Sequence, residues 1–159
     1  MIVEHNLPRP HGLIECETVL DVGAGVRPMN WYKPTRHICV EPCEQYAKHL
    51  TEAGYEVIGK TALDALRTKR KGHAVYLLDV IEHMEKNDAL EVIRLAQIGA
   101  RQVVLFTPVG FMEQDSDGWG LGEDSWQTHR SGWLPREFPD WQTSLYGRGF
   151  YAIWTSTLS

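Results

Sequence analysis

Short apolar runs alternate with helix-forming segments along most of this chain of 159 residues. The clearest run, Thr18–Val22, is rich in β-branched and apolar residues. It ends at Gly23, Ala24 and Gly25, as a buried parallel strand does when it leaves a sheet through a tight turn. Because strands that alternate with helices pair in parallel, this order of segments predicts an α/β fold built on a doubly wound sheet.

Apolar periodicity, interrupted by glycine and proline, predicts the individual elements. The expected strands are Thr18–Val22, His37–Glu41, Tyr55–Ile58, Ala74–Val80, Gln102–Thr107, Trp141–Tyr146 and Phe150–Thr155. The expected helices are Glu44–Ala53, Ala62–Lys69 and a segment that begins at Asn87 or Asp88 and ends near Ile98. Gly54 and Gly99 follow two of these helices and are typical helix stops.

Three connections depart from the regular alternation. Residues 26–35 contain Pro28 and Pro34, which leave room for a turn or two of helix at most. Residues 147–149 (Gly-Arg-Gly) join the last two strands, so these should form a β-hairpin. The stretch Phe111–Trp133 is long, aperiodic and rich in Gly, Asp and Trp, and so long a loop in a compact domain is usually functional.

Length and composition indicate one globular domain spanning residues 1–159. Hydrophobic residues make up 43% and charged residues 23%, which disfavours disordered and collagen-like classes. The formal net charge of -5 makes nucleic acid an unlikely partner, because excess acidic residues repel a phosphate backbone. The single basic run, formed by Arg67, Lys69, Arg70 and Lys71, is expected to be a solvated loop at the amino ends of the strands.

The three cysteines, Cys16, Cys39 and Cys43, show neither paired CxxC spacing nor a grouping with histidine. We therefore predict no disulfide framework and no structural metal, which fits a reducing compartment. The first ten residues lack an apolar stretch long enough for a signal peptide or a membrane span. A cytoplasmic protein without membrane contact is expected.

Acids and glycines recur where the predicted strands end. Asp21, Gly23 and Gly25 accompany the end of the first strand, Glu41 closes the second, and Asp79 lies at the end of the fourth. In an open α/β sheet, ligands bind at these carboxyl ends, beside the point where the strand order reverses. Glycines let the backbone approach a ligand, and an acid about 20 residues downstream can accept both ribose hydroxyls of a nucleoside.

Three motifs resemble class I S-adenosylmethionine-dependent methyltransferases. They are VLDVGAG at residues 19–25, the acid of VEP at residues 40–42, and LDVIEH at residues 78–83. The resemblance implies S-adenosylmethionine as the cofactor and a Rossmann-like seven-stranded sheet of order 3-2-1-4-5-7-6, whose last strand is antiparallel. The Asp-x-x-Glu-His pattern further resembles methyltransferases that act on small molecules and saccharides.

The same resemblance implies roles for individual residues. The glycine turn would pass beneath the methionine part, while Asp21 would orient that turn or bind the amino group through water. Glu41 would hold the ribose. Pro42 with Cys43, and residues 61–63, would flank the adenine, while Asp79 and Val80 would line the methionine side. The implied cofactor-binding residues are Asp21, Gly23, Ala24, Gly25, Glu41, Pro42, Thr61, Ala62, Leu63, Asp79 and Val80. The sequence departs from the family at Arg27, where a third glycine is common.

Two histidines are candidates for contact with the acceptor. His83 is the one group near the expected methyl that is poised near neutrality, so it could take a proton from the acceptor, with a packing or hydrogen-bonding role as the alternative. His129 lies in a THRSGW stretch that also resembles the family. The loop around it should form an acceptor pocket or a lid, or else a mobile solvated loop. Its acids match no metal motif, and we predict no metal site.

Methyl transfer to a small-molecule or saccharide-like acceptor is the leading hypothesis. A non-catalytic S-adenosylmethionine-binding or regulatory module remains open, as does a homodimer. A nucleic-acid methyltransferase is disfavoured, because neither the Asn/Asp-Pro-Pro-aromatic motif nor a Pro-Cys nucleophile follows the fourth strand. A nicotinamide-dependent oxidoreductase is disfavoured because Pro28 replaces the last glycine of the GxGxxG fingerprint.

Overall fold

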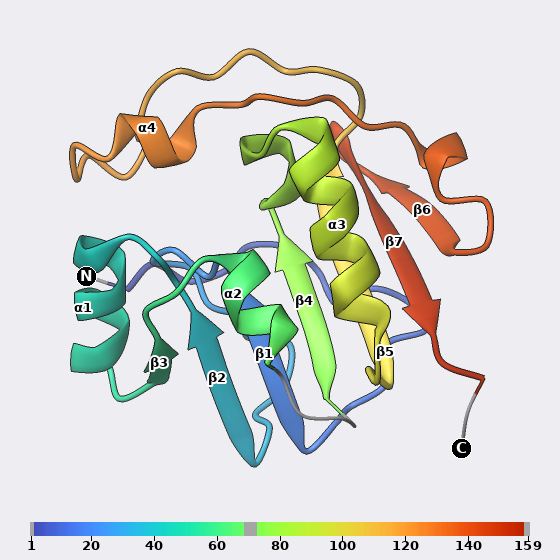
Figure 1. Ribbon diagram of the computed structural model, residues 1–159, viewed down its shortest axis with the longest axis horizontal. Coiled ribbons are helices and arrows are strands. Elements are labelled where there is room, and N and C mark those ends of the chain that lie inside the picture. The colour runs from blue at the N-terminus through green and yellow to red at the C-terminus, as the bar shows by residue number, and fades with distance from the viewer. Residues whose placement is uncertain (1, 69–72, 158–159) are drawn as a thin grey trace.

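A mixed sheet forms the centre of the molecule, with helices on both faces (Figure 1). The computed structural model describes residues 2–68 and 73–157. Its strands are β1 (Thr18–Val22), β2 (Arg36–Val40), β3 (Glu56–Ile58), β4 (Ala74–Leu78), β5 (Gln102–Pro108), β6 (Gln142–Tyr146) and β7 (Gly149–Thr155). The sheet has seven strands in the order β3-β2-β1-β4-β5-β7-β6, and β7 runs antiparallel to both of its neighbours. The predicted fold class and strand order are therefore confirmed.

The helices follow the predicted segments with shifted ends. The α-helices are α1 (Glu44–Glu52), α2 (Ala62–Arg67), α3 (Lys86–Gln97) and α4 (Asp124–Gln127), and the 3-10 helices are η1 (Ile81–His83) and η2 (Pro135–Glu137). Helix α3 begins before Asn87 and Asp88, so neither of these residues caps it as predicted, and Glu85 occupies the cap position. Lys69, the predicted end of α2, lies outside the described residues. No helix forms at residues 26–35.

Strand β4 ends two residues earlier than the apolar pattern predicts. Asp79 has a φ of 56°, a left-handed conformation that an extended strand cannot contain. The chain therefore turns at Asp79 and enters η1, so Val80 and the residues that follow it are carried over the end of the sheet. The turn delivers the Asp-x-x-Glu-His motif to the carboxyl edge.

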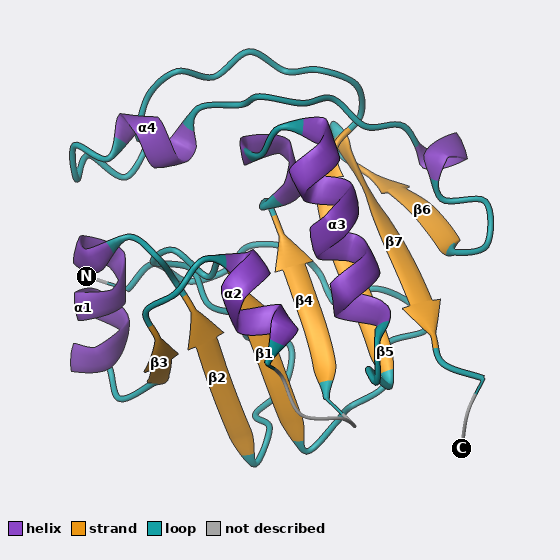
Figure 2. Cartoon of the chain, in the orientation of Figure 1, coloured by secondary structure: helices purple, strands orange, loops and turns teal. Residues whose placement is uncertain are grey.

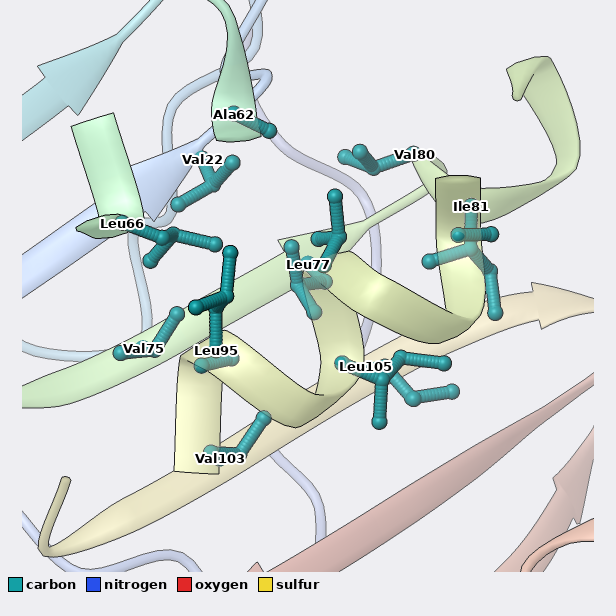
Figure 3. Packing of buried hydrophobic residues seen from close by; sticks show 14 of the residues in the cluster. Val22, Ala62, Leu66, Val75, Leu77, Val80, Ile81, Leu95, Val103 and Leu105 are labelled. Atoms are coloured by element: carbon teal, nitrogen blue, oxygen red, sulfur yellow. The ribbon is translucent and has the colours of Figure 1, made fainter. Parts of the chain in front are cut away.

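Residues facing α2 and α3 form the larger part of the core (Figure 3). Val75 and Leu77 of β4 point toward these helices, as do Val103 and Leu105 of β5, because alternate residues of a strand face the same side. Leu95 of α3 packs among them. Burying a side chain of this size stabilises a fold by about 1.5–3 kcal/mol.

On the opposite face, irregular segments do much of the covering. Helix α1 lies beside β3, and the rest is packed by the N-terminal segment and by residues 26–35. Leu7 and Met29 are buried there against Tyr76 of β4. The indole N–H of Trp31 donates to the Leu7 carbonyl at 2.7 Å, and the Tyr151 hydroxyl donates to the carbonyl of residue 8 at 2.6 Å. These bonds fix the N-terminal segment on the sheet.

The long connection between β5 and η2 arches over the carboxyl ends of the parallel strands (Figure 2). It is loop apart from α4. This position allows the predicted acceptor pocket or lid. The three cysteines are buried and free. Within the described ranges, no helix has the length and apolar character needed to cross a membrane.

Candidate active site at the carboxyl edge of the sheet

A cavity of about 730 Å³ lies at the carboxyl edge, between the strand ends and the long connection. Ligand sites commonly have volumes of about 300–1,000 Å³. Most of the residues predicted from sequence line it, namely Gly23, Ala24, Glu41, Pro42, Thr61, Ala62, Leu63, Asp79, Val80, His83 and His129. Asp21 and Gly25 are absent from the lining. Eleven of the thirteen predicted residues therefore meet at one cavity, and the other two lie outside its lining.

The turn after β1 forms part of the cavity floor. Gly23 has a φ of 66°, and a Cβ at that position would lie 2.8 Å from Cγ2 of Val80. Gly25 has a φ of 59°, and a Cβ there would collide with the ring of Trp119, which covers it. Only glycine fits either position, since a side chain would be strained by the backbone and blocked by its neighbour.

Asp21 binds the segment that follows the glycine turn. Its Oδ2 accepts a hydrogen bond from the backbone N–H of Met29 at 2.7 Å and lies 2.9 Å from Nε2 of His37. The residue is buried. Both bonds link Asp21 to residues outside the glycine turn, so the two roles that the resemblance implies for Asp21 stay predictions.

Glu41 joins the turn after β1 to the end of β2. Its Oε1 accepts from the Gly25 N–H at 2.8 Å, and its Oε2 accepts from the Cys43 N–H at 2.9 Å. An ionised carboxylate has about four acceptor positions, so each oxygen keeps a lone pair for a ligand hydroxyl. The residue is only 5% exposed, and this burial raises its pKa from 4.5 to about 7. Glu41 is therefore an acceptor whose charge depends on pH near neutrality.

Opposite charges meet at the end of the cavity beside β4. Nη2 of Arg27 lies 3.9 Å from Oδ2 of Asp79, and the guanidinium lies 5.7 Å from the centre of the Trp119 ring. His5 also lines this end, and its Nδ1 is the one buried side-chain nitrogen or oxygen of residues 2–68 and 73–157 without a hydrogen bond. Sequence reasoning missed His5, because it belongs to no motif and only packing of the N-terminal segment brings it here.

His83 and His129 both line the cavity, and the centres of their rings are 4.7 Å apart. Burial, with a smaller contribution from His129, lowers the pKa of His83 to about 4. The expectation that His83 is poised near neutrality is therefore wrong, because a buried imidazole resists acquiring charge. At pH 7 the ring is neutral and is a weak base.

Glu82, next to His83, is buried rather than solvated. It is 2% exposed, and its Oε2 accepts from the Thr107 hydroxyl at 3.1 Å. Burial, together with the neighbouring Asp79 carboxylate, raises the pKa of Glu82. Glu82, His83 and His129 each offer one ligand atom, and these atoms lie within 4.8 Å of one another, so this cluster could hold a metal ion.

The long connection is organised by Asp117. Its carboxylate accepts from the backbone N–H groups of Trp119 at 2.8 Å and of Leu121 and Glu123 at 3.2 Å. The Tyr46 hydroxyl of α1 donates to the same carboxylate at 2.8 Å. These bonds attach the loop to the body of the protein and favour a built wall of the cavity over a mobile solvated loop.

Comparison with known proteins identifies the fold through structure alone. No protein-family model matches the sequence, and no curated protein is significantly similar to it. A SAM-dependent methyltransferase from Archaeoglobus fulgidus has a TM-score of 0.65 at 13% identity, over 89% of this chain and 86% of the other. An O-methyltransferase family protein from Burkholderia thailandensis has a TM-score of 0.60 at 17% identity, over 88% and 51%.

A third similar structure is an O-methyltransferase from neocarzinostatin biosynthesis in complex with S-adenosylmethionine and 2-hydroxy-5-methyl naphthoic acid. Its TM-score is 0.55 at 11% identity, over 89% of this chain and 49% of the other. This chain thus spans about half the length of the two O-methyltransferases. These likenesses establish that the chain has the class I methyltransferase fold.

Proposed function

We propose that this protein is an S-adenosylmethionine-dependent methyltransferase that acts on a small-molecule or saccharide-like acceptor. The observation that carries the proposal is the position of Glu41 and Gly23 in one cavity at the edge where the strand order reverses. The sheet order, with an antiparallel β7 between β5 and β6, differs from the 3-2-1-4-5-6 order of the dinucleotide-binding sheet. This difference argues against the nicotinamide alternative.

The cavity offers groups that fit each part of the cofactor. Glu41 has acceptor capacity left for ribose hydroxyls, and the bare backbone at Gly23 allows close approach. Pro42 and the start of α2 provide apolar surface for an adenine ring. The Asp79 carboxylate and the Arg27 guanidinium present opposite charges, which suit an ammonium group and a carboxylate respectively.

When bound, S-adenosylmethionine supplies an electrophilic methyl group, and its transfer forms a bond to the acceptor, breaks the carbon–sulfur bond and leaves S-adenosylhomocysteine. In such an in-line displacement, the protein contributes chiefly by aligning the reactants and excluding water. The Asp117-anchored loop lines the cavity and would limit the entry of water. The neutral His83 ring can accept a hydrogen bond from an acceptor hydroxyl, but its low pKa makes it a poor general base.

The loop wall supports the choice of acceptor class. Trp126, Gln114 and Met112 face the cavity from this loop, and they combine an aromatic surface with an amide and a flexible apolar group. Aromatic faces pack on sugars and planar rings, while amides hydrogen-bond hydroxyls. We propose oxygen as the acceptor atom, because two solved proteins of the same fold are O-methyltransferases.

Calorimetric titration with S-adenosylmethionine, S-adenosylhomocysteine and a nicotinamide dinucleotide tests the cofactor. We expect both adenosyl ligands to bind and the dinucleotide not to bind. Glu41→Gln should weaken binding at least tenfold, whereas Glu44→Gln, an exposed acid three residues away, should not change it. Absence of binding by both adenosyl ligands would overturn the proposal.

Turnover is then measured as formation of S-adenosylhomocysteine in the presence of phenolic, hydroxy-acid and saccharide acceptors. Product formation with a member of this panel supports the enzymatic function. Cofactor binding without turnover of any acceptor would instead support the non-catalytic alternative.

A further inference from the structure

One part of the cavity lining brings together two imidazoles and a carboxylate from segments far apart in the sequence. Glu82 and His83 belong to η1, while His129 follows α4 in the long connection. The backbone N–H groups of Arg130 and Ser131 donate to the Glu82 carbonyl at 2.7 and 3.1 Å. These bonds hold the two segments together and place His129 beside the η1 pair.

The hydrogen bonds of the two rings define their tautomers. Nδ1 of His129 lies 2.6 Å from the Met112 carbonyl oxygen, and Nδ1 of His83 lies 3.4 Å from the Thr128 carbonyl oxygen. A carbonyl oxygen only accepts, so each Nδ1 carries a hydrogen, and Nε2 is the ring nitrogen left to offer a lone pair. A backbone carbonyl that orients the second nitrogen in this way is typical of histidines that bind a metal.

The Glu82 carboxylate is oriented in the same manner. The Thr107 hydroxyl binds Oε2, while Oε1 lies 3.9 Å from Nε2 of His83, too far for a hydrogen bond. Among the ion pairs found for the described residues, the neutral His83 ring is the only basic partner of Glu82. Glu82 is 2% exposed and shares a side-chain hydrogen bond with Asp79, so two acidic groups meet in the interior without a cation among the ion pairs of Glu82. A bound cation would stabilise this arrangement.

We propose that Glu82, His83 and His129 bind a divalent metal ion, with the adjacent Asp79 carboxylate available as a further oxygen donor. One ligand atom from each of the three residues lies within 4.8 Å of the others. Two imidazole nitrogens combined with carboxylate oxygen suit first-row ions such as Mn²⁺, Fe²⁺, Co²⁺ and Zn²⁺. Because all three residues line the cavity, coordination positions would remain open toward a ligand.

A second group with similar composition, Asp21, His37 and Cys39, does not support the same inference. Its ligand atoms also lie within 4.8 Å of one another. However, Oδ2 of Asp21 is already bound to Nε2 of His37 and to the Met29 N–H, and none of the three residues lines the cavity. This group is a satisfied structural contact.

One consequence of the metal site rests on the proposed function, although the site itself does not. A divalent ion lowers the pKa of a hydroxyl that binds it, so an acceptor hydroxyl could lose its proton to water without a protein base. The ion would then take the place of His83 in activating the acceptor, because His83 would use its Nε2 lone pair to bind the ion. The favoured acceptors are those with two neighbouring oxygens that can chelate the ion.

Metal binding is tested on the full chain after treatment with a chelator, with Mn²⁺ as the probe and no cofactor present. Electron paramagnetic resonance measures free Mn²⁺ during the titration. We expect one Mn²⁺ per chain, and at least tenfold weaker binding for His129→Ala and for Glu82→Gln. The matched controls His11→Ala and Asp140→Asn, both at exposed positions, should bind as the unaltered protein does. No binding at millimolar Mn²⁺, or equal binding by all variants, would overturn the proposal.

Pulsed electron paramagnetic resonance on the unaltered protein provides a test that does not depend on the stability of variants. Nitrogen couplings from two directly bound imidazoles are expected, and their absence from bound Mn²⁺ would also refute the site. Calorimetry with S-adenosylhomocysteine in the absence of metal separates the two proposals. Metal binding without adenosyl-ligand binding would retain the site and refute the cofactor, and the reverse would refute only the metal site.

Discussion

The buried acid Glu41 should make the stability of this protein decrease as pH rises toward neutrality. Burial raises its pKa in the folded state from 4.5 to about 7, so folding favours the protonated form. The resulting contribution to stability is fully present below pH 4.5, is lost progressively as pH rises, and is gone above about pH 7. At about 1.4 kcal/mol per pH unit, the difference between these values amounts to about 3 kcal/mol.

Urea denaturation of the ligand-free protein and of Glu41→Gln between pH 4.5 and pH 8 measures this contribution. The variant cannot ionise at this position, so the free energy of unfolding of the unaltered protein, taken relative to the variant, should fall by about 3 kcal/mol across the window and then level off. A relative free energy that is constant with pH, or that rises, would refute the assignment of the raised pKa to Glu41.

Ionisation of Glu41 should strengthen ligand binding as pH rises, whereas it lowers the stability of the ligand-free protein. Ribose hydroxyls donate hydrogen bonds best to the ionised form, so S-adenosylhomocysteine should bind more tightly as pH rises from 5 to 7, by up to about tenfold per pH unit. The affinity should be constant above about pH 7, where Glu41 is ionised. Calorimetry at each pH measures this trend, and a Glu41→Gln variant with the same pH dependence would contradict the role of this residue.

Two further substitutions test the glycine turn and the loop. Gly23→Ala should lower the free energy of unfolding by about 2 kcal/mol and weaken S-adenosylhomocysteine binding, because its φ of 66° is left-handed and its Cβ would lie 2.8 Å from Val80. Gly59→Ala, where no atom lies within 4 Å of the added Cβ, is the control in thermal and urea unfolding, and equal losses would contradict this account. Asp117→Ala should speed hydrogen exchange of the loop amides and cost about 1–3 kcal/mol, because three backbone N–H groups lose their acceptor. The exposed Asp115→Ala should leave exchange unchanged, and similar exchange in both variants would show that Asp117 does not organise the loop.

Much of the fold could be predicted because its signals are local. The apolar run at residues 18–22 with its following glycines, the acid at Glu41 and the apolar run at residues 74–78 each follow from short-range periodicity and turn chemistry. The order of the strands came from the family resemblance of these same motifs and matches the sheet. Element ends were less accurate, as at Asp79, since the left-handed residue that ends β4 has no apolar signature.

The sequence by itself determined the α/β class, the positions of the strands and eleven of the residues that line the cavity. Only the tertiary structure decided that His129 meets Glu82 and His83, and that His5 reaches the cavity from the N-terminal segment. It also decided that His83 is a weak base and that Glu41 titrates near neutrality. The physical reason is that periodicity is encoded between neighbours along the chain, whereas burial and ligand geometry depend on groups that meet only after folding.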